Sequence, residues 1–91
     1  MLDHSFVNDA LDELKDEIED ACKYLKESDD MEAQGLHYLA IGLHRIAMDE
    51  YSHANFLRDW LISKNAYYEH ERHKVIEEHW HKLRGRLGYE S

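Results

Sequence analysis

Two residues near the middle of the chain, Glu50 and His53, have the types and the spacing of a metal-binding pair. They form a Glu-x-x-His unit, and residues three apart on an α-helix lie on one face, about one turn apart. At about 100° per residue, both fall within an apolar stripe, with Glu50 near its centre. A carboxylate buried there needs a cation, a metal ion or a proton. The stripe consists of Leu36, Leu39, Leu43, Ile46, Ala47, Ala54, Leu57 and Leu61.

A second carboxylate, Glu17, lies on the edge of the apolar stripe of the preceding helical segment. Together with Glu50 and His53 it gives each chain two carboxylates and one imidazole. In two chains related by a two-fold axis the set becomes four Glu and two His, which is the ligand set of di-iron and di-manganese carboxylate proteins. Oxygen ligands with imidazole suit iron and manganese. Zinc shares these ligands, so the sequence leaves the metal open.

The alternative to a metal is an ion pair between Glu50 and a buried base. Arg45 lies off the apolar stripe, and Arg58 lies nearer its edge but two turns from Glu50. A second Glu-x-x-His unit, formed by Glu78 and His81, lies on a polar face, where we expect solvated side chains.

The composition indicates one all-α domain over residues 1–91. The chain has 91 residues, no Pro and four Gly, and many Leu, Glu, Lys and Ala, a composition that favours helices. Helical periodicity predicts helices over about residues 8–27, 30–63 and 66–84. The predicted breaks between them are Ser28-Asp29-Asp30, where Asp29 and Glu32 resemble a capping box, and Ser63-Lys64-Asn65.

Two features concern how the second predicted helix is covered. Gly35 and Gly42 lie on one flank of that helix, where glycine costs roughly 1 kcal/mol, and they predict a close approach of a neighbouring helix as compensation. Three helices also make a poor closed core, because small domains bury only about 60% of their unfolded surface. The first two helices form an antiparallel hairpin, and two hairpins about a two-fold axis complete a four-helix bundle.

Charge and composition bear on the partners and on the compartment. The formal net charge of -9 disfavours binding to nucleic acid. There is no apolar run of about 18 residues for a membrane span and no signal-peptide pattern after Met1. Cys22 is the single cysteine, which fits a reducing compartment. We therefore expect a cytoplasmic protein.

Two short segments resemble the encapsulated ferritins, the small two-helix members of the ferritin-like superfamily. The first is Asp16-Glu17-Ile18-Glu19, with Tyr24 two turns after Glu17. The second is Glu50-x-x-His53-Ala54, with Trp60-Leu61 two turns after His53. The chain departs from that family at Lys23, where an aromatic residue often stands, and in a longer turn and a longer, His-rich third helix.

The resemblance implies roles for these residues. Glu17, Glu50 and His53 would be ferroxidase ligands at a subunit interface in a ferritin-like four-helix bundle, holding two iron ions per dimer. Asp16 and Glu19 would attract iron, and Tyr24 would flank the site. The family forms dimers or rings of dimers inside an encapsulin nanocompartment, although no tail here resembles the peptide that docks in such a shell.

Three functions follow as hypotheses. The first is a ferroxidase that oxidises Fe(II) with oxygen or peroxide and feeds iron storage or detoxification. The second is a rubrerythrin-like protein that scavenges peroxide with the same ligands. The third is a non-catalytic helical assembly module in which Glu50 and His53 are hydrogen-bonded across the interface.

Overall fold

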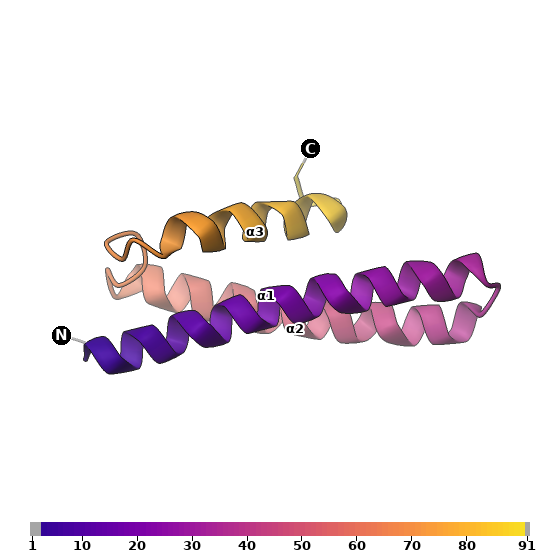
Figure 1. Cartoon of the computed structure of the whole chain (residues 1–91), viewed down its shortest axis with the longest axis horizontal. Helices are drawn as coiled ribbons and strands as arrows, with labels where there is room; N and C mark the ends of the chain where they lie inside the picture. Colours follow the sequence, from indigo (N-terminus) through magenta and orange to yellow (C-terminus); the bar gives the residue numbers. More distant parts are fainter. Residues whose placement is uncertain (1–2, 91) are drawn as a thin grey trace.

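The computed structural model describes residues 3–90 and contains only helices there (Figure 1). Helix α1 spans His4–Ala33, α2 spans His37–Ser63 and α3 spans His73–Arg86. The first two form a long antiparallel hairpin, and α3 lies along one side of it, near the open end (Figure 1). The prediction of an all-α hairpin with a third helix is confirmed, and pairing into a four-helix bundle stays a prediction.

Helix α1 is longer at both ends than the sequence predicted. The Asp3 side chain caps its start by accepting a hydrogen bond from the Ser5 backbone N–H at 2.7 Å. At the other end α1 continues through the predicted break at residues 28–30. That prediction is wrong because Ser28 is buried, and its hydroxyl donates to the Ala40 carbonyl at 2.7 Å. Ser28 therefore ties α1 to α2 instead of ending a helix.

The real turn lies at Gly35, so α2 begins at His37 and not near residue 30. Gly35 has a φ of +79°, a conformation that glycine adopts without strain. Glu32 forms no capping box and hydrogen-bonds to His37 Nδ1 at 2.8 Å across the turn. At Gly42 an added Cβ would meet nothing within 4 Å. The same holds at Gly35, so the predicted close approach of a helix at these two glycines does not occur among residues 3–90.

Helix α3 begins seven residues later than predicted, because residues 64–72 form a loop that turns the chain back over the hairpin. Asn65 has a φ of 55°, which starts this turn. Tyr67 is buried inside the loop, where its hydroxyl donates to Glu77 at 2.7 Å. On α3, Trp80 is buried and stacks on Tyr51 of α2, with ring centroids 5.0 Å apart. These contacts hold α3 against the hairpin.

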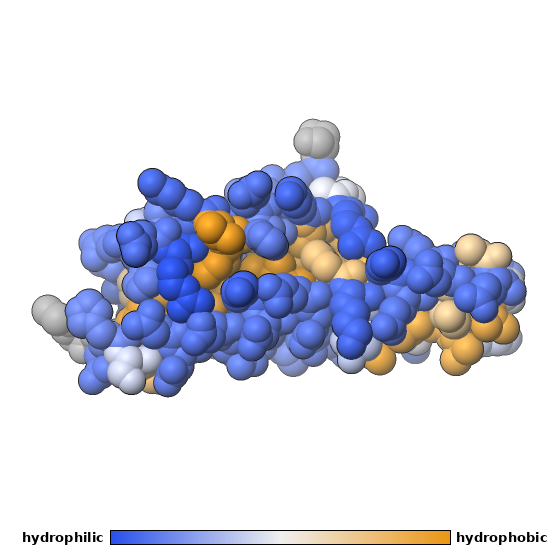
Figure 2. All heavy atoms as spheres, in the orientation of Figure 1, coloured by the Kyte–Doolittle hydropathy of each residue, from blue (hydrophilic) through white to orange (hydrophobic). Residues whose placement is uncertain are grey.

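The hairpin buries only part of the apolar surface predicted for its second helix. Ala47, Ala54 and Leu61 are buried against the rest of the chain. Three larger side chains of the same predicted stripe are exposed: Leu36 at 43%, Leu39 at 57% and Ile46 at 42%. Apolar surface gathers over the turn end of the hairpin (Figure 2).

The described part of the chain is thin and long, with extents of 50 × 25 × 17 Å. None of its helices is apolar over a length sufficient to cross a membrane. A hairpin this thin leaves one of its faces without a covering layer, and the candidate site lies on that face.

Candidate metal centre

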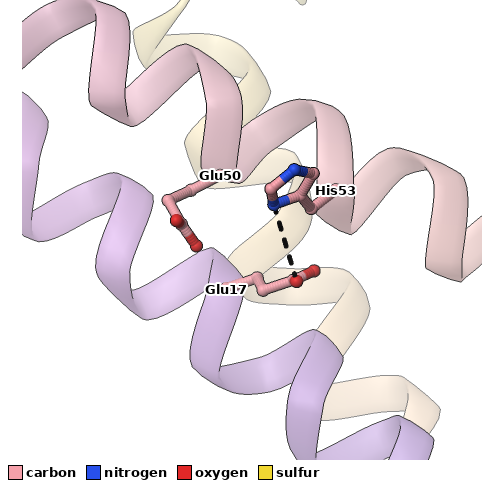
Figure 3. A group of neighbouring side chains, drawn as sticks. All are labelled: Glu17, Glu50 and His53. Atoms are coloured by element: carbon pink, nitrogen blue, oxygen red, sulfur yellow. Dashed lines mark ion pairs between the residues drawn. The ribbon is translucent and has the colours of Figure 1, made fainter.

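Glu17, Glu50 and His53 come together at the middle of the hairpin. Each offers one ligand atom, and these atoms lie within 4.8 Å of one another. Glu17 projects from near the middle of α1, and Glu50 and His53 project from the middle of α2 (Figure 3). The structure thus brings together all three residues that the sequence predicted as ligands, from two different helices.

The two site residues of α2, Glu50 and His53, do not point toward α3. Tyr51 points toward α3, since it stacks on Trp80. Residues are 100° apart around a helix, so Glu50 lies a quarter turn from Tyr51 and His53 points to nearly the opposite side. Figure 3 shows α3 passing behind the two helices that carry the site. The site therefore opens onto the uncovered face of the hairpin.

Glu17 is the buried carboxylate of the site. Its side chain is 13% exposed, and its Oε2 is a buried oxygen with no hydrogen-bond partner among residues 3–90. Burial raises the pKa of Glu17 to about 7, helped by the nearby carboxylates of Glu13 and Glu50 and opposed by His53. A buried oxygen without a donor is the kind of group that a metal ion satisfies.

Glu50 and His53 lie further out than the sequence predicted. Glu50 is half-buried, and the His53 side chain is 64% exposed. The His53 Nδ1 lies 3.9 Å from Oε1 of Glu17 (Figure 3), a distance too long for a hydrogen bond. The expectation that Glu50 is buried among core leucines is therefore wrong for the single chain, because nothing covers this part of α2.

The alternative partner for Glu50, a buried arginine, is engaged elsewhere. Arg58 forms a two-pronged ion pair with Glu77 of α3, with one of its bonds at 3.0 Å. The Arg58 guanidinium also lies over the ring of Trp80, 5.6 Å from its centroid. Arg58 therefore anchors α3 and does not neutralise the site.

The donor set fits a hard divalent cation, with one shortfall. Two carboxylates and an imidazole suit iron, manganese or zinc, and the unpartnered Oε2 of Glu17 gives such an ion a reason to bind. Iron and manganese take more ligands than three residues supply. Because the site opens onto an uncovered face, further ligands have room to come from outside the chain.

Asp16, Glu19 and Tyr24 surround the site less closely. Asp16 and Glu19 are exposed, and Glu19 lies 3.8 Å from the ammonium group of Lys15. Tyr24 is half-buried against the core, with the Lys23 ammonium 5.7 Å from its ring centroid. The roles that the family resemblance implied for these residues stay predictions.

Glu13 is a site residue that the sequence analysis missed. It is exposed, one turn before Glu17 on α1, and its negative charge helps to raise the pKa of Glu17. The spacing of four residues was a signal that the two carboxylates share a face of α1. This signal was hard to recognise, because α1 contains many acidic residues and several other pairs of them are also three or four residues apart.

The second Glu-x-x-His unit assembles no comparable site. Glu78 is exposed and lies 3.9 Å from Lys82. His81 is exposed too, and its two ring nitrogens contact Glu90 at 2.8 Å and Glu77 at 3.1 Å, on opposite edges of the ring. Within residues 3–90, Glu17, Glu50 and His53 form the group whose ligand atoms converge.

No protein-family model, curated protein or solved structure matches this chain. The likeness to encapsulated ferritins therefore rests on its short motifs, and what the site does is inferred from its own side chains.

Proposed function

We propose that two copies of the chain pair through the open face of the hairpin and oxidise Fe(II) at a di-iron site between them. The observation that carries this proposal is the buried, unpartnered Oε2 of Glu17 beside Glu50 and His53. A group of two carboxylates and an imidazole supplies half of the ligands that a di-iron carboxylate centre needs. A second copy supplies the other half.

The position of the site along the hairpin supports this pairing. Glu17 and Glu50 lie near the middle of their helices, so a two-fold axis through the site lays two hairpins against each other over their whole length. The turn end of one hairpin, with exposed Leu36 and Leu39, then meets the open end of its partner. Phe6 is 51% exposed there and packs edge-to-face on Trp60.

Each residue has a defined task in such a centre. Glu17 and Glu50 bind the two ions, one of them as a bridge, and His53 supplies a nitrogen to each ion. Each Fe(II) gives up one electron, and oxygen or peroxide accepts the pair. A pair of hairpins encloses no storage volume, so mineral storage requires a separate shell, such as an encapsulin.

An anaerobic Fe(II) titration followed by admission of air tests the proposal. We expect saturation near one iron per chain, because two chains share two ions, and a prompt rise of near-ultraviolet absorbance when air enters. Glu50→Ala should abolish both, since it removes one ligand in three from each chain. The matched control is Glu78→Gln in the second Glu-x-x-His unit, which should behave as the wild type. Binding that survives Glu50→Ala contradicts the proposal.

A second function, assembly without catalysis, is favoured by the exposed leucines of α2. Leu36, Leu39 and Ile46 require cover whether or not a metal is bound. Under this alternative a chelator leaves the dimer intact, and Glu50→Gln is tolerated or stabilising. Oxidation of Fe(II) at the wild-type rate by Glu50→Gln would show that Glu50 is not part of the oxidation site.

A further inference from the structure

The segment that follows α3, residues 87–90, turns back along that helix. Gly88 has a φ of +83°, a conformation that glycine adopts without strain, and the Tyr89 backbone N–H donates to the Arg84 carbonyl at 2.9 Å. The Tyr89 ring then stacks on Tyr51 of α2, with ring centroids 5.3 Å apart. The segment therefore contacts the hairpin at Tyr51, a residue that is only 9% exposed.

Two basic side chains of α3 hold Glu90, the last residue of this segment. Arg84 Nε donates to Glu90 Oε2 at 2.9 Å, and His81 Nδ1 lies 2.8 Å from both oxygens of the Glu90 carboxylate. Arg84 also donates to the Tyr51 hydroxyl at 2.7 Å, and its guanidinium lies 5.6 Å from the centroid of the Tyr89 ring. His81 and Arg84 thus fasten the segment to α3 and, through Tyr51, to α2.

His81 faces a carboxylate at each of its ring nitrogens. Nδ1 faces Glu90, and Nε2 lies 3.1 Å from Oε2 of Glu77. Glu77 is itself held by Arg58 of α2 and by Tyr67 of the loop before α3. A neutral imidazole carries a proton on one nitrogen and can donate to one carboxylate, whereas an imidazolium donates from both nitrogens. The observed arrangement is therefore that of the protonated ring.

We propose that His81 is a pH-operated latch, whose protonated ring holds residues 87–90 in place and whose neutral ring lets them loosen. The inference is independent of the proposed function, because His81, Glu77 and Glu90 lie outside the candidate metal centre. When the ring loses its proton it can bond to only one of the two carboxylates, and Glu90 keeps Arg84 as its one cationic partner. Loosening of the segment uncovers Tyr51.

The pKa shifts of the two partners give the pH range over which the latch acts. The hydrogen bond to Glu90 raises the pKa of His81 above 6.5, and the same bond lowers the pKa of Glu90 below 4.5. Their attraction therefore acts in full between pH 4.5 and 6.5 and is lost as pH rises through the raised pKa of His81. Arg84 keeps its charge throughout this range, so the change belongs to His81.

Nuclear magnetic resonance spectroscopy at a series of pH values tests the latch. The Tyr89 ring protons average between stacked and free positions, so their chemical shifts report the fraction of the segment that is held. We expect the ratio of held to free segment to fall roughly three- to fivefold between about pH 6 and 9, because one exposed ion pair is lost. The midpoint should coincide with that of the His81 ring and lie above 6.5.

Two pairs of variants isolate the groups involved. His81→Gln should abolish the pH dependence of Tyr89, since glutamine does not titrate, whereas His79→Gln, which removes another exposed histidine of α3, should preserve it. Glu90→Gln should lower the pKa of His81 toward 6.5, because it removes the main cause of the raised value. Glu78→Gln, which removes an exposed carboxylate that contacts Lys82, should leave the pKa of His81 unchanged.

Two results overturn the inference. The first is a Tyr89 signal that stays constant over this pH range in the wild type, or that changes equally in His81→Gln. The second is a pKa of His81 that does not exceed 6.5, or one that Glu90→Gln leaves as it is in the wild type. All of these measurements are made without metal, so the failure of the proposed function has no effect on their outcome.

Discussion

Glu17 holds its carboxyl away from water and next to two other acids, and this arrangement opposes its ionisation. Burial raises its pKa from 4.5 to about 7. In the metal-free protein it therefore keeps its proton well into the range where the unfolded chain has lost it. Under the proposed function a metal ion would have to displace this proton to bind, which would link occupancy of the site to pH.

The stability of the metal-free protein should reflect this pKa. The folded state holds more protons than the unfolded state between pH 4.5 and about 7, so stability falls as pH rises through that window and then levels off. Glu17→Gln should remove this loss. We expect it to raise the free energy of unfolding by roughly 2 to 3 kcal/mol at about pH 8 and to leave it unchanged at about pH 4. Urea unfolding with a chelator present measures both values.

Glu19→Gln serves as the control for this change, because Glu19 is exposed and paired with Lys15 at the surface. It should alter stability by less than about 0.5 kcal/mol at either pH. If Glu17→Gln changes the free energy of unfolding by the same amount at high and at low pH, the Glu17 carboxyl has no raised pKa.

At the scale of elements, one ion pair docks α3 on the hairpin. Arg58 and Glu77 are 15% and 16% exposed, and Tyr67 donates a further hydrogen bond to Glu77. Burial acts to raise the pKa of Glu77, but the hydrogen bonds from Arg58 and Tyr67 outweigh it and lower that pKa below its usual value. Its ionised form is therefore favoured by folding.

Glu77→Gln should weaken the docking of α3. It leaves Arg58 with an uncompensated buried charge, and the expected loss is roughly 3 kcal/mol of unfolding free energy near neutral pH. The ion pair stabilises the folded state above pH 4.5. This stabilisation disappears as pH falls through the pKa of Glu77 in the folded protein, which is lower than 4.5. Urea unfolding gives the loss, and near-ultraviolet circular dichroism reports the stacked Trp80 and Tyr51.

Glu78→Gln, on the neighbouring exposed position of α3, should leave both signals unchanged, because its contact with Lys82 is a surface pair. If the two variants lose the same stability, the ion pair of Arg58 does not hold α3 in place.

At the scale of the whole molecule, the open face of the hairpin predicts a dimer. Leu39→Lys places a charge on that face, near the turn end of the hairpin. It should raise the dimer dissociation constant roughly a hundredfold or more, because a leucine is lost from the interface in each of two copies. Sedimentation equilibrium measures the change. Under the proposed function, metal binding should weaken with it, since each ion would draw ligands from two chains.

Tyr38→Lys is the matched control. Tyr38 is adjacent in sequence, belongs to the same helix and is 93% exposed, but it points to another side of α2. It should leave the dimer intact. Dissociation by both variants, or by neither, would place the contact between copies elsewhere.

The sequence by itself determined the helical class, the hairpin and the three candidate ligand residues. Helix formation and the facing of residues three or four apart are local properties, so periodicity and composition suffice for them. Glu17, Glu50 and His53 interrupt or border apolar stripes, and the structure brings all three together.

Only the tertiary structure decided how exposed each site residue is, where the helices end and what Arg58 pairs with. Exposure depends on which neighbour covers a face, so the Glu17 side chain is only 13% exposed while that of His53, on the uncovered side of α2, is 64% exposed. Ser28 continues a helix because Ala40, twelve residues away, accepts its hydroxyl. Arg58 pairs with Glu77 because the loop over residues 64–72 carries α3 back across the hairpin. Each of these outcomes depends on contacts between distant segments, and helical periodicity carries no information about them.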